Sequence, residues 1–294
     1  MIRKLVYLWI AVLSHSNCLG PEDVSRLQDA VAVGDFKTAE PLFERQNFAY
    51  HTPELFSKTT EPTPTFQLLT IISSNGLLSM ITEDDVRSFS TNICFQIVHH
   101  VRKIGSPLRH MTLTCFAALS SRMDIRDAKY IPIEFVRMYP NAFSKAFPYF
   151  HVYTPQQLVE VSSVPVACKN FNANSFHYIE SRTMYKAMNP KCLSEMEGIE
   201  KADFGKAMKD RKVPGDFFSY YCGALREDAY KFMRPDHVSL IGINCYHKDV
   251  RFPLPMELLT PNALQGVTPR LFSEWVECQE KIGNIGWAWQ HFRN

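Results

Sequence analysis

The sequence is poor in glycine and lacks the short motifs that mark common catalytic sites. It has 12 glycines in 294 residues, and it contains no glycine-rich phosphate loop, no Gly-x-Ser-x-Gly turn and no His-Glu-x-x-His pair. These are the signatures of nucleotide-binding enzymes, α/β hydrolases and zinc proteases. No Asn-x-Ser or Asn-x-Thr occurs among its 13 asparagines, so we do not expect N-linked glycans.

The chain also lacks an excess of charge of one sign. It has 32 basic and 30 acidic residues. The first 18 residues hold Arg3, Lys4 and no acid, so their removal leaves 30 of each sign. A nucleic-acid-binding protein needs a basic face. The longest basic cluster, Lys209 to Lys212, is interrupted by Asp210, so we do not expect a nucleic-acid partner.

Long apolar runs are absent after the start of the chain. Leu5 to Leu13 is a run of nine apolar residues, preceded by the two basic residues and followed by small polar ones. This order predicts a signal peptide over residues 1–18, cleaved between Cys18 and Leu19. Nine residues are too few for a span that needs about 20. We therefore expect a secreted protein with no membrane span in the mature chain.

Cys-x-x-Cys is absent, and the remaining cysteines are widely spaced. Cysteines at equivalent places in stacked helices lie about 8–10 Å apart, whereas a disulfide needs Cα atoms within about 7 Å. We expect most of them to be small buried hydrophobic residues, with one or two disulfides at most. Cys222, His237, Cys245 and His247 have zinc-binding atoms, but their spacing matches no zinc motif, so we predict no metal and no cofactor.

The chain begins with a predicted helical hairpin over residues 19–50. The stretch from Leu27 to Phe36 resembles the helix-turn-helix of an ankyrin or tetratricopeptide unit. A Pro/Thr-rich loop is predicted for residues 51–65. The third region, residues 66–294, opens with an apolar helix from Phe66 to Ile72 and a capping box at Thr82 and Asp85.

Apolar pairs three or four positions apart recur about every 25 residues from Val86 onward, with prolines between them. Two pairs per unit predict two short helices per unit. The alternative is the ordinary core spacing of an all-α protein. The first series is Val86/Phe89, Leu108/Met111, Phe135/Met138, Leu158/Val161, Phe176/Ile179, Phe204/Met208, Tyr230/Met233 and Leu258/Leu259. The second is Cys94/Ile97, Cys115/Leu119, Phe143/Phe147, Cys168/Phe171, Cys192/Met196, Phe217/Tyr221, Leu240/Ile243 and Leu264/Val267.

The stretches Met256 to Phe272 and Tyr153 to Val161 share a Thr-Pro-x-x-Leu rhythm. In this they resemble the short-helix repeats of the mesothelin, stereocilin and otoancorin family, over about residues 82–275. The resemblance implies a secreted or surface-anchored superhelix that acts in adhesion. The sequence ends without a lipid-anchor tail, so membrane tethering is not part of the expectation.

Two further clusters were considered as sites. His99, His100, His110 and Cys115 contain a Cys-His pair, but adjacent histidines point to different helix faces, and a solvated helix end near Lys103 is the better account. Trp287, Trp289 and Phe292 are candidate partner contacts, or they cover the last repeat.

Together these patterns predict an all-α protein, an α-solenoid-like array of short helix pairs. The predicted function is that of a secreted, non-enzymatic scaffold or adhesion protein facing a protein or a cell-surface or wall partner. Two alternatives stay open. One is a secreted hydrolase whose site is assembled from distant residues, and the other is a self-assembling coat or wall component.

Overall fold

The computed structural model describes residues 21–39, 56, 62–218, 225–241, 244–247 and 250–282. The chain divides into two compact units, residues 1–135 and 136–294, a division that falls inside the range 66–294 predicted as one region. The described part is helical apart from one small hairpin, which confirms the all-α class. Among the described helices, none combines the length and the apolarity that a membrane crossing requires.

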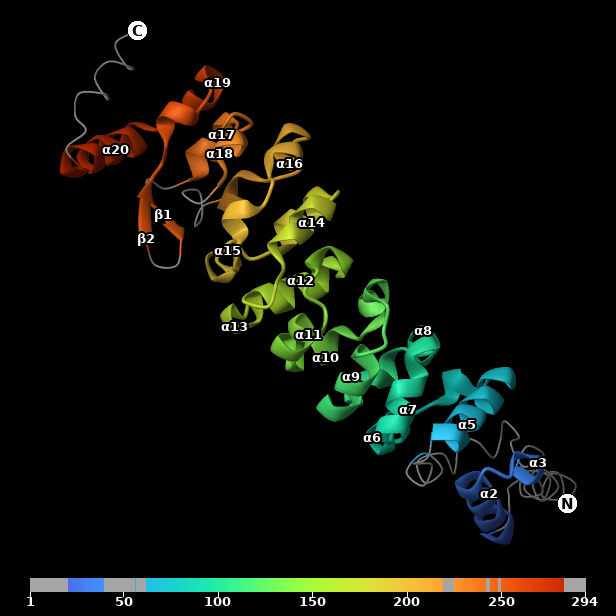
Figure 1. The fold of residues 1–294 in the computed structure, drawn as a ribbon. Coiled ribbons are helices and arrows are strands. Elements are labelled where there is room, and N and C mark those ends of the chain that lie inside the picture. The colour runs from blue at the N-terminus through green and yellow to red at the C-terminus, as the bar shows by residue number, and fades with distance from the viewer. Residues whose placement is uncertain are drawn as a thin grey trace, which may run out of the picture. The chain divides into compact units, whose positions relative to one another are not determined.

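The helices of the first unit are short and separated by tight turns (Figure 1). The α-helices are α2 (Pro21–Val33), α3 (Phe36–Ala39), α5 (Pro62–Ser74), α6 (Glu83–Ser88), α7 (Thr91–Gln96), α8 (Val101–Ile104), α9 (Leu113–Ser120) and α10 (Ile133–Met138), which crosses the division. The 3-10 helices are η2 (Leu77–Met80), η3 (Ile97–His99), η4 (Ser106–His110) and η5 (Ile125–Tyr130).

Hydroxyl side chains begin several of these helices. The Thr82 hydroxyl accepts from the Asp85 amide, and the Asp85 carboxylate accepts from the Thr82 amide at 2.6 Å, which confirms the predicted capping box. Thr112 caps α9 in the same way, through the Cys115 amide. Helix α5 begins at Pro62 rather than at Phe66, because proline suits the first helical turn, where no amide donor is needed.

Helices this short are unstable alone and depend on packing. In the first unit α7 lies between α5 and α9, and α6 packs on η4. The buried side chains between them are large and apolar, among them Leu68, Ile93 and Leu108, each fully buried.

The second unit continues the same style of short elements and adds a strand pair. Its α-helices are α11 (Pro140–Ala146), α12 (Pro155–Ser162), α13 (Pro165–Cys168), α14 (Arg182–Ala187), α15 (Cys192–Glu195), α16 (Gly205–Lys209), α17 (Glu227–Tyr230), α18 (Pro235–Leu240), α19 (Pro261–Leu264) and α20 (Pro269–Ile282). Its 3-10 helices are η6 (Phe150–Val152), η7 (Ala173–Tyr178), η8 (Ile199–Lys201), η9 (Gly215–Phe218) and η11 (Met256–Leu258). The strands β1 (Asn244–His247) and β2 (Val250–Pro253) form an antiparallel hairpin.

Alternate helices of this unit lie against one another. Helix α13 packs between α11 and α15, while α12 packs on α14 (Figure 1). Aromatic rings fill the space between the elements: Phe176 contacts Phe150, Phe204 and Phe217, with ring centroids 4.6, 4.6 and 5.8 Å apart. Phenylalanine therefore supplies much of this core.

Most of the predicted apolar pairs are buried. Leu258, Leu264 and Val267 are half-buried, and two further described residues are exposed. Met138 is 54% exposed and Leu240 is 55% exposed. Each is the last residue of its helix, and the buried positions belong to Val136 and Val238. A helix of six residues makes fewer than two turns, so sequence spacing alone does not decide which apolar residues face inward.

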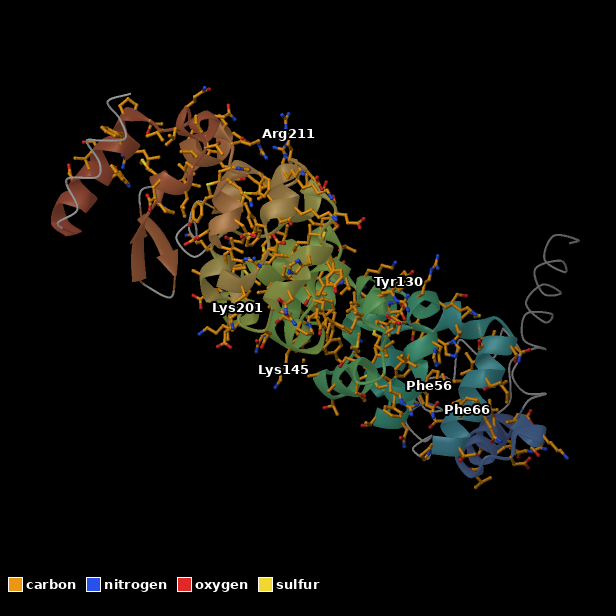
Figure 2. The ribbon with its side chains drawn as sticks, turned by 45° about the horizontal axis from the view of Figure 1, so that its top comes forward. Phe56, Phe66, Tyr130, Lys145, Lys201 and Arg211 are labelled. Carbon is orange, nitrogen blue, oxygen red and sulfur yellow. A yellow bond between two sulfur atoms is a disulfide. The ribbon has the colours of Figure 1, made fainter. Side chains whose placement is uncertain are left out.

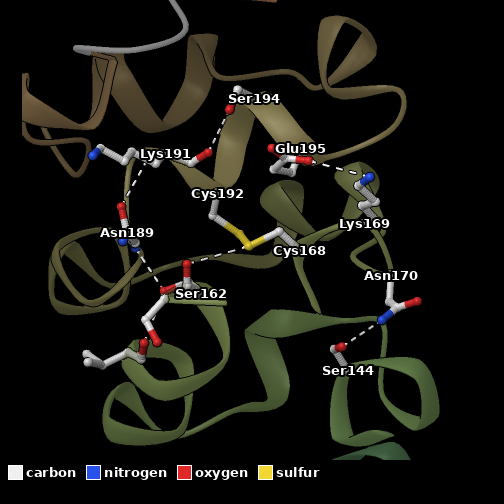
Figure 3. The surroundings of a disulfide bond; sticks show 12 residues. Ser144, Ser162, Cys168, Lys169, Asn170, Asn189, Lys191, Cys192, Ser194 and Glu195 are labelled. Atoms are coloured by element: carbon white, nitrogen blue, oxygen red, sulfur yellow. Dashed lines mark hydrogen bonds and ion pairs between the residues drawn. A yellow bond between two sulfur atoms is a disulfide. The ribbon is translucent and has the colours of Figure 1, made fainter. Parts of the chain in front are cut away.

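Two disulfides join neighbouring helices in the described residues. Cys94 of α7 bonds to Cys115 of α9 with Cα atoms 5.1 Å apart, and Cys168 of α13 bonds to Cys192 of α15 at 5.4 Å (Figure 3). The expectation that such cysteines lie too far apart is wrong for these pairs. Helices of four to eight residues meet near their ends, so their backbones approach more closely than long helices packed side by side.

Candidate functional site

The first unit contains a cleft of about 190 Å³ between α5, α7 and the turn after α7. Helix α5 places Phe66 and Thr70 four positions apart, so both lie on one face of the helix. Phe66 is 60% exposed, an unusual exposure for so large an apolar side chain (labelled in Figure 2). The full lining is Phe66, Leu69, Thr70, Phe95, Gln96, Val98, His99, His100 and Arg122.

An arginine stacked on an aromatic ring forms part of this cleft. The guanidinium carbon of Arg122 lies 3.8 Å from the centre of the Phe95 ring, a cation–π contact. Arg122 follows α9, and Phe95 is next to Cys94, so the disulfide between α7 and α9 holds the two side chains together. Stacking uses the face of the guanidinium and leaves its N–H edges available for a ligand. Among the described residues, no carboxylate pairs with Arg122.

Two histidines add polar character. His100 Nδ1 is buried and has no hydrogen-bond partner among the described residues. Burial lowers the pKa of His100, and the nearby positive charges of Lys103 and His99 lower it further, so its ring is neutral at pH 7. No acidic residue lines the cleft. The site is thus an apolar floor with one cation, Arg122, at its wall.

The structure separates the predicted Cys-His cluster. Cys115 is bonded to Cys94, so it has no free thiol for nucleophilic chemistry. His99 and His100 line the cleft, whereas His110 belongs to a charged group on α6 and η4. There its Nε2 lies 2.8 Å from a carboxylate oxygen of Glu83, and its Nδ1 lies 3.0 Å from Arg87.

The predicted zinc-type residues are not assembled in the described part of the chain. The Val213 carbonyl can only accept, so His237 Nε2 must donate to it, at 2.9 Å. His237 Nδ1 then accepts from the Arg234 amide at 3.2 Å. Both ring nitrogens of this fully buried residue are occupied, and the described part of the chain holds no cluster of three metal-binding side chains.

Several sequence predictions lie outside the described residues. These are Cys222, the side chains of Cys245 and His247, the cleavage site at Cys18 and Leu19, and the tail residues Trp287, Trp289 and Phe292. They stay predictions.

Sequence reasoning did not single out Phe66, Phe95 and Arg122. A usable signal was present for one of them. Phe95 follows the anchor Cys94 directly, so the two side chains do not share one face of the helix. Phe66 lies three positions before the buried Leu69, so its spacing does not mark it as exposed. No family model matches this sequence, and no curated protein or solved structure is detectably similar to it.

Proposed function

We propose that this chain is a secreted, non-enzymatic scaffold whose short helices form a repeat array of about 25 residues per unit. Such an array presents a surface to a protein or to a cell-surface or wall partner. The observation that carries the proposal is the sequence separation of the contacts between helices. Repeat proteins are held by contacts between neighbouring units, and these contacts therefore recur at one repeat length.

Contacts at this separation recur within each unit. In the first unit, Arg109 bonds to Glu83, which lies 26 residues earlier. In the second unit, the Asn170 amide group donates to Ser144 at 2.9 Å and a separation of 26, and the Asn189 backbone donates to Ser162 at a separation of 27 (Figure 3). These bonds differ in chemistry, but they share a sequence separation of 26 or 27 residues.

The disulfides follow the same separation. They join residues 21 and 24 positions apart, one between α7 and α9 and one between α13 and α15, and the helices of each pair are in contact. Stable disulfides are a feature of oxidising compartments. They support secretion, as does the apolar run behind a basic start at the N-terminus.

The proposal is tested with the full-length chain expressed in a secreting host. We expect the protein in the medium, with an intact mass that starts at Leu19 and keeps both disulfides. The labelled protein should bind intact cells saturably, and protease treatment of the cells should abolish that binding. Retention inside the host, or turnover of ester, peptide or glycoside substrates by the pure protein, would contradict the proposal.

A further inference from the structure

The cleft of the first unit has the size and chemistry of a small-ligand site, which the scaffold function does not require. A dry cavity of about 150 Å³ is large enough for benzene. The cleft, at about 190 Å³, therefore has room for one ring and a small polar group. Phe66, Leu69 and Val98 offer an apolar surface for the ring.

The polar groups of the cleft select the charge of the ligand. Arg122 has five N–H donors in a planar fork, a geometry that matches a carboxylate. Among the described residues its side chain interacts with the Phe95 ring, and no acid in the lining competes for it. The His100 ring also lines the cleft, but its Nδ1 is shielded from solvent and is therefore out of reach of a ligand. Arg122 is positively charged and no acidic residue in the lining offsets that charge, so the cleft favours an anionic ligand.

We propose that this cleft binds a free monocarboxylate attached to an apolar body of about one ring, an arylalkanoic acid in its ionised form. The carboxylate is held by the N–H edge of the Arg122 guanidinium. The ring packs against Phe66, whose exposed face is then covered. The Cys94–Cys115 disulfide joins α7, which carries Phe95, to α9, which ends two residues before Arg122. It therefore restrains the two segments that supply these side chains before the ligand arrives.

The test uses 3-phenylpropionate as the probe and 3-phenylpropionamide, its uncharged isostere, as the comparison. Both are titrated into the full-length secreted protein by calorimetry. We expect saturable binding of the carboxylate with a dissociation constant of about 1 mM or below, and binding about tenfold weaker for the amide, since one charged hydrogen-bond pair is lost.

The decisive variant is Arg122→Gln, with Arg126→Gln as its matched control. Arg126 lies in the same unit, is highly exposed, pairs with Asp124 and does not line the cleft. Arg122→Gln should weaken carboxylate binding about tenfold and leave amide binding unchanged, whereas Arg126→Gln should change neither. Phe66→Ala should weaken both ligands equally.

Three results would overturn the proposal. They are equal affinity of the wild-type protein for the carboxylate and the amide, equal losses in the two arginine variants, and no saturable binding at all. Near-UV circular dichroism checks that each variant is folded. If Arg122→Gln does not fold, Arg122→Lys provides the second test. It keeps the positive charge but loses the planar fork, and it should reduce the preference for the carboxylate over the amide.

Discussion

Two polar networks, one in each unit, join successive turns at nearly the same sequence separation but differ in burial. In the first unit, Glu83 of α6 contacts Arg109 and His110, which lie 26 and 27 residues later. Burial opposes the charge of Glu83, but Arg109 and His110 outweigh it and hold the pKa of that carboxyl below its usual value. The Glu83 and Arg109 side chains are each 40% exposed.

In the second unit, Arg234, which precedes α18, and His237 of α18 reach back to α16 and the segment that follows it. Arg234 donates to the Met208 and Val213 carbonyls at 3.3 and 3.1 Å, and His237 donates to Val213 as well. Asp236 holds the guanidinium by two bonds of 2.9 Å. The Arg234 side chain is only 18% exposed and His237 is fully buried.

The comparison shows that polar contacts at a similar sequence separation contribute differently to stability, depending on how deeply they are buried. Water and salt screen the exposed network around Glu83, so it fixes geometry and adds little stability. The Arg234 network satisfies backbone carbonyls that water does not readily reach, and such groups are costly to leave unpaired. Burial, rather than the presence of an ion pair, decides which link stabilises the fold.

The largest effect is expected at the disulfides, and it should be the same in both units. Their loops span 21 and 24 residues, and the chain-entropy model gives about 3 kcal/mol for each. We expect Cys94→Ala/Cys115→Ala and Cys168→Ala/Cys192→Ala to lower the free energy of unfolding by about this amount. Urea denaturation measures it, and hydrogen exchange shows which unit opens. A decrease in the free energy of unfolding below about 1 kcal/mol for either double variant would contradict the chain-entropy estimate.

The second prediction separates the two networks. Arg234→Met should cost about 2–3 kcal/mol, because it removes charged hydrogen bonds to the Met208 and Val213 carbonyls. Arg109→Met, the matched change in the exposed network, should produce no measurable loss. Urea denaturation at low and at high salt gives both values, and the Arg234 effect should not depend on salt. If Arg234→Met and Arg109→Met lower the free energy of unfolding equally, burial does not decide how much each network stabilises the fold.

The third prediction uses pH to distinguish His237 from its neighbours. Burial is the main cause that lowers the pKa of His237 from the ordinary 6.5. Below pH 6.5 the unfolded chain therefore binds more protons than the folded one, and stability falls as the pH drops. Above that pH the contribution is constant. The carboxyls whose pKa is lowered, Glu83 and Asp236 among them, titrate further down the scale and lie outside this window.

His237→Gln tests this directly. A glutamine at this position can still accept from the Arg234 amide, as in an ordinary capping box, but it does not titrate. We expect a smaller loss of stability between pH 7.5 and 5.5 than in the wild type, measured as the shift in urea midpoint. Some loss should persist, since burial also lowers the pKa of His100 and His151. An unchanged pH dependence would show that His237 is not the titrating group.

The sequence predicts local features of this fold, such as helix caps and buried anchor residues, better than it predicts the contacts between helices. The capping box at Thr82 and the buried anchors Phe143, Leu158 and Phe204 follow from residue types and spacing. The exposed Met138 does not, because a short helix offers several apolar residues for few inward positions. Local sequence patterns therefore predict a residue's position correctly where only one residue suits that position, as at a helix cap.

The candidate site was beyond reach for a different reason. Phe95 and Arg122 meet only because α7 and α9 are neighbours, and nothing in either segment specifies how closely their ends approach. The same missing quantity, the distance between short helices, misled the prediction about Cys94 and Cys115. Once the distance between α7 and α9 is known, the Cys94–Cys115 disulfide and the contact between Phe95 and Arg122 can both be predicted from the residue types.

The smallest predicted effect compares one backbone position in each unit. Arg211 has φ 58°, a left-handed conformation in which glycine is usual. It lies just after α16, where its amide donates to the Met208 carbonyl and the Lys212 amide donates to the Ala207 carbonyl, the two bonds of a Schellman turn. In the first unit, Gly76 follows α5 with φ 70° and has open space where a Cβ would lie.

We expect Arg211→Gly to stabilise the protein by about 0.5 kcal/mol. This is the left-handed penalty of a non-glycine residue, roughly 1–2 kcal/mol, less the entropy that glycine adds to the unfolded chain, about 0.5–1 kcal/mol. Gly76→Ala should destabilise by a similar amount, because only the backbone conformation opposes the methyl group. Thermal unfolding of both variants checks the two signs. If Arg211→Gly destabilises instead, the Arg211 side chain stabilises the turn by more than its backbone strain costs.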